Sequence, residues 1–327
     1  MEFEEVFDLV SDDLQKVELE LSKHVMSQVL LIPEVANYIL LSGGKRFRPL
    51  VLILAAKLCG YAGNHHVPLA SVFEFIHTAS LLHDDVVDNA EIRRGSSSVN
   101  SVWGNETSVL LGDYLFSKSF SLVTSIGDLK VLRVLSEATT RLAEGEIMEL
   151  MKSGDPHTTE EDYISIITEK TAVLISAACQ VGAILGNASH ETEKALRGFG
   201  LNLGIAFQLV DDILDYTSTE EQFGKAIGKD LHEGKITLPL IHTLRVCSDS
   251  DRERITKIIE SDDHRGPDLS ILLTIINLIK QYEGVEHTFN RARGYVEIAK
   301  GFLRDFDTSR EKQALLAMAD YVIERKW

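Results

Sequence analysis

The chain has 327 residues, of which 44 % are hydrophobic and 25 % are charged, values typical of a globular protein with enough apolar material for a core. Its 50 acidic residues outnumber its 33 lysines and arginines, which gives a formal net charge of −17. Because general affinity for nucleic acid comes mainly from Lys and Arg, this balance argues against a nucleic-acid-binding protein, although not against phosphate binding at one local site.

Cysteine content and hydropathy indicate the compartment. Cys59, Cys179 and Cys247 are widely spaced and form no CxxC pair, so neither a disulfide framework nor a zinc site is expected. The acidic N-terminal stretch does not resemble a signal peptide. The longest weakly polar run, residues 171–185, is shorter than the roughly 20 apolar residues that a membrane span needs. We therefore expect a soluble, reduced, cytoplasmic protein.

Apolar residues recur at helical spacing along nearly the whole chain. In residues 72–86 they occur every three or four positions, which is typical of one buried helix face, and residues 160–186 and 196–216 continue the pattern. No alternating runs are joined by Asn-Gly or Asp-Gly turns, so strands are not expected. Breaks are expected at Pro33, at residues 43–49, 60–68, 95–100, 154–156, 186–187 and 217–234, and Pro33, Pro49 and Pro68 suit first helical turns.

The segments between these breaks predict about a dozen helices, several of them longer than the average of about 11–12 residues. No linker rich in Gly, Ser or Pro divides the chain, and no low-complexity segment occurs. The sequence therefore predicts one all-α domain that spans residues 1–327.

Two acidic clusters with the same i, i+1, i+4 spacing interrupt the apolar helices. Residues four apart project from the same helix face, and residue i+1 lies about 100° round, so each cluster offers two stacked carboxylates with a third beside them. Burying carboxylates among Leu, Val and Ile is costly unless they are paired or metal-bound. One such triplet is usually a solvated face, whereas two favour a site for Mg²⁺, which combines one or two carboxylates with water and phosphate oxygens. The clusters are Asp84, Asp85 and Asp88, and Asp211, Asp212 and Asp215.

Basic residues accompany both clusters. The segment SGGKRFRPL places cations behind a glycine pair at an expected helix start, a natural site for an anion. Each cation alone is more often solvated than functional, but together with the carboxylates they indicate a polyanion such as a diphosphate, held through magnesium and through Lys and Arg. These residues are Lys45, Arg46 and Arg48, Arg93 and Arg94, Lys170, and Lys225, Lys229 and Lys235.

The motifs GGKRFRP, HDDVVD…RRG, EKTA and FQLVDDILD resemble those of trans-type polyprenyl diphosphate synthases in order and approximate spacing, over residues 43–239. The resemblance implies a large isoprenoid-synthase-type helical bundle around a central cavity, a homodimer, and about three magnesium ions per active site when substrate is bound. It implies that the first aspartate cluster binds magnesium with the allylic diphosphate and that the second completes the metal site.

The resemblance also assigns roles to single residues. Arg93, Lys170, Thr171, Gln208, Lys225 and Lys235 would hold the allylic diphosphate, and Lys45, Arg48, His77 and Arg94 would hold isopentenyl diphosphate. Taken alone, His77 on an apolar helix face is more often a core residue, and we expect His83 to be a packing residue. Glu144, Glu146 and Glu149 fall where the family has a partly acidic helix, and Glu149 is the strongest candidate among them. The implied catalytic set is Asp84, Asp85, Asp88, Arg93, Lys170, Asp211 and Asp212.

The implied reaction is ionisation of an allylic diphosphate such as farnesyl diphosphate, followed by addition of successive isopentenyl units. Ala79 and Ser80 precede Asp84 by about 6–7.5 Å of helical rise, where short-chain enzymes tend to carry a bulky aromatic residue. Their small side chains favour a long all-trans product, most like octaprenyl, for quinone side chains. The alternative is a medium- or short-chain enzyme, such as a heptaprenyl catalytic subunit or a geranylgeranyl or farnesyl diphosphate synthase. A long product would favour transient membrane contact, although no basic amphipathic anchor is evident.

Three other functions remain open from the sequence. A class I terpene cyclase normally has an asymmetric second metal motif, and it would leave GGKRFRP unexplained. A non-catalytic subunit of a heteromeric synthase should have eroded acidic clusters, whereas both are intact here. The catalytic half of an obligate heterodimer is the third alternative.

Overall fold

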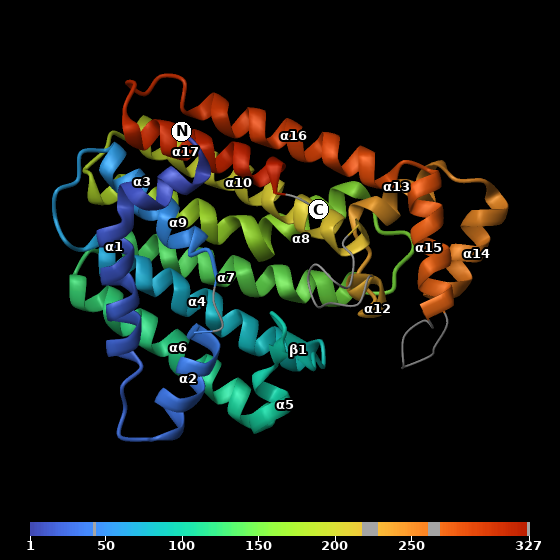
Figure 1. Cartoon of the computed structure of the whole chain (residues 1–327), viewed down its shortest axis with the longest axis horizontal. Helices are drawn as coiled ribbons and strands as arrows, with labels where there is room; N and C mark the ends of the chain where they lie inside the picture. The colour runs from blue at the N-terminus through green and yellow to red at the C-terminus, as the bar shows by residue number, and fades with distance from the viewer. Residues whose placement is uncertain (42–43, 218–227, 261–268, 326–327) are drawn as a thin grey trace. The chain divides into compact units, whose positions relative to one another are not determined.

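The computed structural model describes residues 1–41, 44–217, 228–260 and 269–325, and these are predominantly helical, as predicted (Figure 1). The chain divides into two compact units, each built from three segments. Unit 1 comprises Met1–Thr139, Leu174–Gly200 and Phe302–Met318, and unit 2 comprises Thr140–Val173, Leu201–Gly301 and Ala319–Trp327. A single domain over residues 1–327 stays a prediction.

Helix α4, His66–Val87, forms the centre of unit 1. It packs against α6, Asn105–Ile126, which runs beside it in Figure 1, and against α1, Phe3–His24, and α3, Phe47–Leu58. Its predicted apolar face is confirmed for five residues, each of which is at most 1 % exposed: Val72, Phe75, Ile76, Ala79 and Leu82. The sixth, Val86, is only half-buried, because it lies in the last turn of the helix beside the aspartates.

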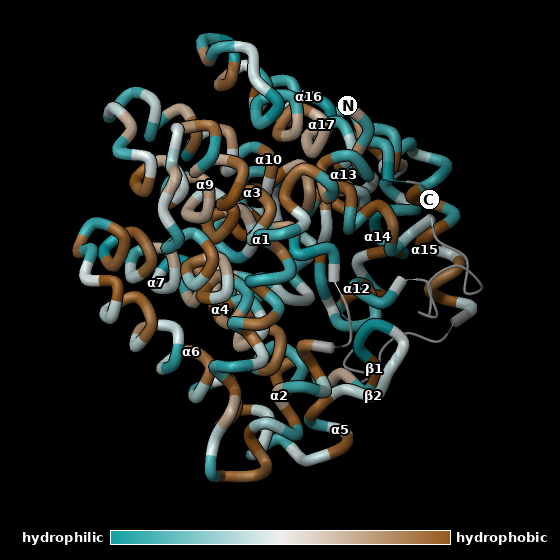
Figure 2. Tube along the Cα trace, turned by 60° about the vertical axis from the view of Figure 1, so that its left-hand side comes forward, coloured by the Kyte–Doolittle hydropathy of each residue, from teal (hydrophilic) through white to brown (hydrophobic). Residues whose placement is uncertain are grey.

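Helix α3 is one of the most apolar elements of unit 1, as the hydropathy colouring of Figure 2 shows. Every residue from Leu50 to Ala56 is completely buried. Pro49 lies in its first turn, where the missing N–H has no helical partner to lose, as the sequence predicts. The remaining elements of unit 1 include α2 (Leu31–Leu41), α5 (Val99–Trp103), α9 (Val173–Leu185), and the beginnings of α7 (Leu129–Lys152), α10 (His190–Thr217) and α17 (Arg310–Glu324).

The expectation of no strands is wrong at one place. Strands β1, Ile92–Arg93, and β2, Ser96–Ser97, form a short antiparallel hairpin directly after α4. The two residues between them, Arg94 and Gly95, have φ angles of 52° and 79°, and a tight hairpin turn requires such positive values at both central positions. Arginine rarely adopts this conformation, so the Arg-Gly pair was not recognised as a hairpin turn.

In unit 2, helix α8, Glu160–Ile167, begins where the sequence predicts. Thr159 and Asp162 form a capping box, in which the Thr159 hydroxyl accepts the N–H of Asp162 and the carboxylate of Asp162 accepts the N–H of Thr159. The expected continuous helix is interrupted, however, by the π-helix η1, Thr168–Ala172, before α9. Such insertions are rare and are frequent at functional sites.

In the described residues, the stretch Glu160–Leu185, which includes η1, is the one long and apolar enough to cross a membrane. Two thirds of its most apolar window is buried inside the protein, as in the core helix of a globular protein. The other helices of unit 2 are α12 (Lys229–His232), α13 (Leu238–Val246), α14 (Asp249–Ile259), α15 (Leu269–Gln281) and α16 (Gly284–Phe302), with the ends of α7, α10 and α17.

Candidate functional site

The first aspartate cluster lies at the C-terminal end of α4. Asp84 and Asp85 lie in its last turn, and Asp88 is its C-cap residue. The exposed carbonyl groups at this end of a helix carry partial negative charge, so carboxylates here are destabilising unless cations compensate them. The last turn itself contains no basic residue. The compensating charge must therefore come from elsewhere in the chain or from a bound cation.

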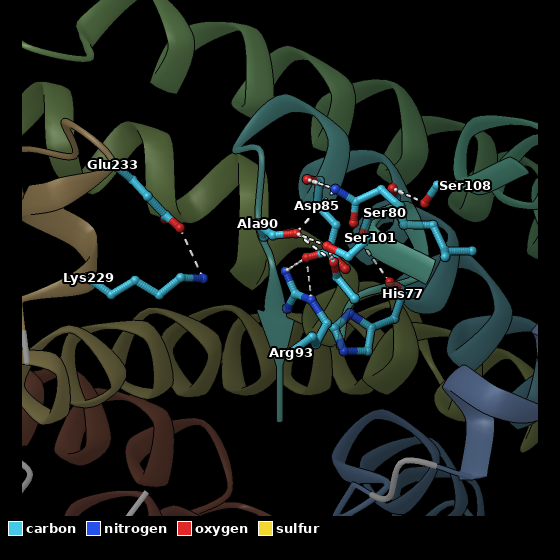
Figure 3. Close-up of polar contacts among 12 residues, drawn as sticks. His77, Ser80, Asp85, Ala90, Arg93, Ser101, Ser108, Lys229 and Glu233 are labelled. Carbon is cyan, nitrogen blue, oxygen red and sulfur yellow. Dashed lines mark hydrogen bonds and ion pairs between the residues drawn. The ribbon is translucent and has the colours of Figure 1, made fainter. Parts of the chain in front are cut away.

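Part of that charge comes from the hairpin. Asp85 is completely buried, and its Oδ1 atom accepts a hydrogen bond from Nε of Arg93 at 2.6 Å and forms an ion pair with Nη2 of the same residue, also at 2.6 Å. Figure 3 shows the guanidinium pointing at this carboxylate. The other oxygen, Oδ2, is also buried and has no hydrogen-bond partner within the described residues. The amide of Asn100 donates to the main-chain oxygens of Asp85 and Ala90, both at 3.1 Å, and so holds the end of the helix in place.

Further cations of unit 1 surround His77. Burial and the nearby guanidinium groups of Arg48, Arg94 and Arg93 hold the pKa of His77 well below its ordinary value, so the imidazole is neutral. Arg94 reaches Gly44, since a Cβ atom there would lie 3.2 Å from its Nη1 atom. The structure thus brings Arg48, His77 and Arg94 together, three of the four residues predicted to hold isopentenyl diphosphate, and the exposed Lys45 is the neighbour of Gly44 in sequence.

Arg46 has a different role from the one expected. Its guanidinium donates to Glu74 at 2.9 Å, to Glu18 at 2.5 and 3.0 Å, and to the main-chain oxygen of Leu40 at 3.1 Å. Only 13 % of its side chain is exposed. Arg46 therefore anchors the start of α3 to α1 and α4 and is not available as an anion ligand.

The second aspartate cluster lies near the C-terminal end of α10. Asp215 is in the last turn, which contains no basic residue, and Asp211 and Asp212 are in the turn before it. Its members have different surroundings. Asp211 is paired with Arg325 at 2.8 Å, and 40 % of its side chain is exposed. The carboxylate of Asp215 accepts the backbone N–H groups of Lys229 at 3.2 Å and Asp230 at 3.0 Å, at the start of the short helix α12.

Asp212 is the buried member, with 3 % of its surface exposed. Its Oδ1 atom accepts a hydrogen bond from Nε2 of Gln208 at 2.8 Å, and its Oδ2 atom accepts one from the hydroxyl of Tyr163. Burial raises the pKa of Asp212 to about 7 although these two hydrogen bonds oppose the rise, and the negative charges of Asp211 and Glu149 add to it. A bound cation would relieve this accumulation of negative charge.

A cavity of about 100 Å³ within unit 2 adjoins Asp212. At its wall, Nζ of Lys170 forms ion pairs with Glu146 and Glu149, both at 2.6 Å, and the hydroxyl of Thr171 donates to Oε1 of Gln208 at 2.9 Å. The π-helix carries both Lys170 and Thr171. Four of the residues predicted to hold the allylic diphosphate line this cavity, namely Lys170, Thr171, Gln208 and Lys235.

Two other residues predicted for the allylic diphosphate lie elsewhere. Arg93 belongs to unit 1, and Lys225 lies outside the described residues. Ala79, predicted to affect product length, is completely buried in α4, and the hydroxyl of Ser80 donates to the main-chain oxygen of His77 at 2.9 Å. Lys229, part of the predicted basic group, pairs with Glu233 at 3.0 Å (Figure 3).

Several residues of the site were missed by the sequence analysis. Tyr163 gave no signal, because one tyrosine in an apolar helix is typical of a core residue. Asp230, which lines the cavity, has a pKa well above its ordinary value because of burial and the nearby Asp215 and Asp212. Asp230 could have been identified from the sequence, since it lies between Lys229 and Lys235, two of the predicted basic residues. Arg325 is too distant in sequence from Asp211 for spacing to reveal the pair.

The donor atoms around both clusters fit a hard divalent cation. No group of three or more His, Cys, Asp or Glu side chains in the described ranges is arranged to hold a metal ion by itself. Magnesium needs no such group, because it takes one or two carboxylates and completes its octahedron with water and phosphate oxygens. The unpartnered Oδ2 of Asp85 and the raised pKa of Asp212 are the two observations that favour a cation at these places.

Comparison with known proteins identifies the family. A polyprenyl synthetase family model matches residues 29–276. The chain is 41 % identical to octaprenyl diphosphate synthase of Escherichia coli (strain K12) over 325 residues, which cover 99 % of each protein. Among solved structures, a decaprenyl diphosphate synthase from Rhodobacter capsulatus is 38 % identical and superposes with a TM-score of 0.93 over 99 % of both chains.

A second structure is that of a polyprenyl synthase from Caulobacter crescentus CB15 complexed with calcium and isoprenyl diphosphate. It is 37 % identical, with a TM-score of 0.94 over 99 % of this chain and 98 % of that one. Sequence and fold agree over nearly the full length, and the chain therefore belongs to the polyprenyl synthetase family, whose all-α isoprenoid synthase fold it shares.

Proposed function

We propose that the chain is a trans-prenyltransferase that condenses farnesyl diphosphate, or a similar allylic diphosphate, with successive isopentenyl diphosphates to give octaprenyl diphosphate. The observation that carries this proposal is the repetition of one arrangement. Each unit carries three aspartates in the last two turns or at the C-cap of a helix, where negative charge in the last turn is unfavourable, and each supplies cations for an anionic group. A reaction between two diphosphate esters uses both sets.

The residues of unit 1 suit isopentenyl diphosphate. Lys45, Arg48 and Arg94 would bind its phosphate oxygens, because Lys and Arg form strong charge-assisted hydrogen bonds with phosphate. His77 is neutral and can hydrogen-bond a phosphate oxygen through one ring nitrogen. Arg46 holds the start of α3 in place and thereby the segment that carries Lys45 and Arg48.

The residues of unit 2 suit the allylic diphosphate. Lys170 and Lys235 supply positive charge at the cavity, and the NH₂ group of Gln208 supplies a hydrogen-bond donor. The hydroxyl of Thr171, which donates to Gln208, would donate to a phosphate oxygen by exchanging that bond. In the described structure the charge of Lys170 is compensated by Glu146 and Glu149, so substrate binding exchanges these carboxylates for phosphate oxygens. Arg93 and Lys225 complete the proposed set.

Divalent metal ions would stabilise the charge of the departing diphosphate, and we propose about three magnesium ions per active site. The residues that would hold them are Asp84, Asp85, Asp88, Asp211, Asp212 and Asp215. The lysine and arginine side chains would stabilise the same developing charge. The allylic C–O bond breaks, the double bond of isopentenyl diphosphate attacks the allylic carbon, and a proton passes to the released diphosphate. Holding both substrates in fixed positions makes this encounter effectively unimolecular.

The proposed product length depends on the residues that precede the first aspartate cluster. Ala79 is a small residue on the helix that carries the first cluster, and its burial means that a larger side chain there would displace its neighbours. The small size of Ala79 and Ser80, rather than this burial, supports a long product, with a medium- or short-chain product as the alternative. A homodimer and a cytoplasmic location belong to the same proposal. Transient membrane contact during release of the polyprenyl chain belongs to it too, because a long polyprenyl tail prefers lipid.

The test is incubation of the purified chain with farnesyl diphosphate, radiolabelled isopentenyl diphosphate and Mg²⁺, followed by dephosphorylation and chromatographic sizing of the alcohols. The proposal predicts consumption of isopentenyl diphosphate and a product series that ends at octaprenol. A terpene cyclase would consume the allylic substrate without isopentenyl diphosphate. Absence of activity in the single chain, restored by a second protein, would show the catalytic half of a heterodimer.

A further inference from the structure

Tyr163 is a buried polar residue to which the proposed function assigns no role. Only 4 % of it is exposed, yet its hydroxyl donates a hydrogen bond to Oδ2 of Asp212. Oδ1 of the same carboxylate accepts from Gln208 at 2.8 Å, and Oε1 of Gln208 in turn accepts from the hydroxyl of Thr171 at 2.9 Å. The four side chains form one continuous hydrogen-bonded series across α8, α10 and η1.

We propose that Tyr163 is a positioning residue, which fixes the carboxylate of Asp212 and through it the side chain of Gln208 for the diphosphate of the allylic substrate. This inference rests on the proposed function, because it presupposes that Gln208 holds that diphosphate. Tyr163 itself need not touch the substrate.

The orientation of the Gln208 amide is the step through which Tyr163 acts. Gln208 and Asp212 are four residues apart on α10, so their side chains lie on one face of the helix. In its ionised form Asp212 only accepts hydrogen bonds, and it therefore selects the NH₂ end of the amide and leaves the amide oxygen for Thr171. One N–H of that NH₂ group is used by Asp212, and the second is left as a donor for a phosphate oxygen.

This orientation depends on Asp212 keeping one conformation. A carboxylate held by Gln208 alone could rotate about its side-chain bonds, whereas a second bond from a different helix fixes both oxygens. The ring of Tyr163 is confined by burial in α8, so its hydroxyl is a rigid donor. Hydrogen bonds to a charged acceptor are stronger than neutral ones, which suits a residue that must fix a carboxylate.

Tyr216 supplies a matched control. It is also a buried tyrosine of unit 2, with 1 % of its surface exposed, and it lies on the same helix as Asp212. Its hydroxyl is hydrogen-bonded to Oγ1 of Thr237 at 2.8 Å and takes no part in the series described above. Its substitution by Phe removes the same hydroxyl group from a buried site, there with a neutral partner, but leaves Asp212, Gln208 and Thr171 in place.

The experiment compares Tyr163→Phe with Tyr216→Phe in the purified full-length chain. Binding of farnesyl diphosphate with Mg²⁺, without isopentenyl diphosphate, is measured by calorimetry, and turnover is measured separately. Loss of one hydrogen bond to a charged group predicts that Tyr163→Phe weakens farnesyl diphosphate binding and raises its KM by about tenfold. The KM of Tyr163→Phe for isopentenyl diphosphate should stay within about twofold of the wild-type value. In Tyr216→Phe the KM values for both substrates should stay within the same limit.

A double substitution tests the route through Asp212. If Tyr163 acts by way of this carboxylate, Tyr163→Phe should have a much smaller effect in an Asp212→Asn background than in the wild type. Equal effects of the two tyrosine substitutions, or a parallel rise of the KM for both substrates, would overturn the inference while leaving the proposed function intact. A wild-type chain that binds farnesyl diphosphate but transfers no prenyl group would instead overturn the proposed function.

Discussion

Replacement of Arg93 by alanine tests whether the first aspartate cluster depends on an outside cation. The Arg93 guanidinium donates a hydrogen bond to Oδ1 of Asp85 and forms an ion pair with it; the Asp85 side chain is 1 % exposed and the Arg93 side chain is 24 % exposed. Removing one partner of a buried ion pair costs about 3–5 kcal/mol. Because water can reach the Arg93 side of this pair, we expect Arg93→Ala to lower the free energy of unfolding by about 2–3 kcal/mol.

Guanidinium chloride unfolding, followed by circular dichroism without divalent cations, measures this loss. The double variant Asp85→Asn/Arg93→Ala should recover most of it, because the unpaired buried charge is then absent. Arg133→Ala is the control, since Arg133 is exposed on α7 and its loss should change stability by less than about 0.5 kcal/mol. The reasoning is refuted if Arg93→Ala behaves like Arg133→Ala, or if the double variant is no more stable than Arg93→Ala.

Three further predictions concern product length, pH and packing. Ala79→Tyr should shorten the product in the chromatographic assay, and an unchanged chain length would exclude the proposed role of Ala79. Burial and the neighbouring arginines hold the pKa of His77 well below its ordinary value of 6.5, so the unfolded chain binds a proton there that the folded chain does not. The free energy of unfolding should therefore fall as the pH drops below 6.5, by at most about 1.4 kcal/mol per pH unit. Thermal unfolding should show a shallower fall for His77→Gln than for the wild type. Parallel pH dependences of the two proteins would contradict this. A Cβ atom at Gly145 would lie 2.5 Å from the backbone nitrogen of Lys170. Gly145→Ala should therefore lower the free energy of unfolding in denaturant by about 1–3 kcal/mol and should lower kcat/KM. Gly294 has open space around it, so Gly294→Ala should lower neither quantity.

Helical periodicity was sufficient to predict most of the architecture. The buried face of α4, the start of α8 at Thr159 and the first-turn position of Pro49 all follow from local patterns, and the structure confirms them. The hairpin and the π-helix η1 were not predicted, because neither has a distinctive local signal. An Arg-Gly turn contains a residue that seldom adopts positive φ, and a π-helix differs from an α-helix by one residue per turn in hydrogen bonding rather than in apolar spacing.

In the candidate site, too, features with a local sequence pattern were predicted and contacts between distant elements were not. The repeated acidic spacing revealed both clusters, because charge within an apolar helix is visible in sequence. Partners supplied by other elements were not visible: Arg46 was grouped with the anion-binding residues but is bound to Glu18 and Glu74. Likewise, nothing near Tyr163 or Asp212 in sequence indicates that their side chains meet. Pairings of this kind are set by tertiary packing rather than by spacing along one helix.

Asp84→Ala provides the most direct test of the central claim that the aspartate clusters drive prenyl transfer. Because Asp84 lies at a helix end where its negative charge is unfavourable, its removal should leave the fold intact. The account predicts that this variant keeps the circular dichroism spectrum of the wild type and loses essentially all incorporation of isopentenyl diphosphate at saturating Mg²⁺. Incorporation close to the wild-type rate under the same conditions would contradict it.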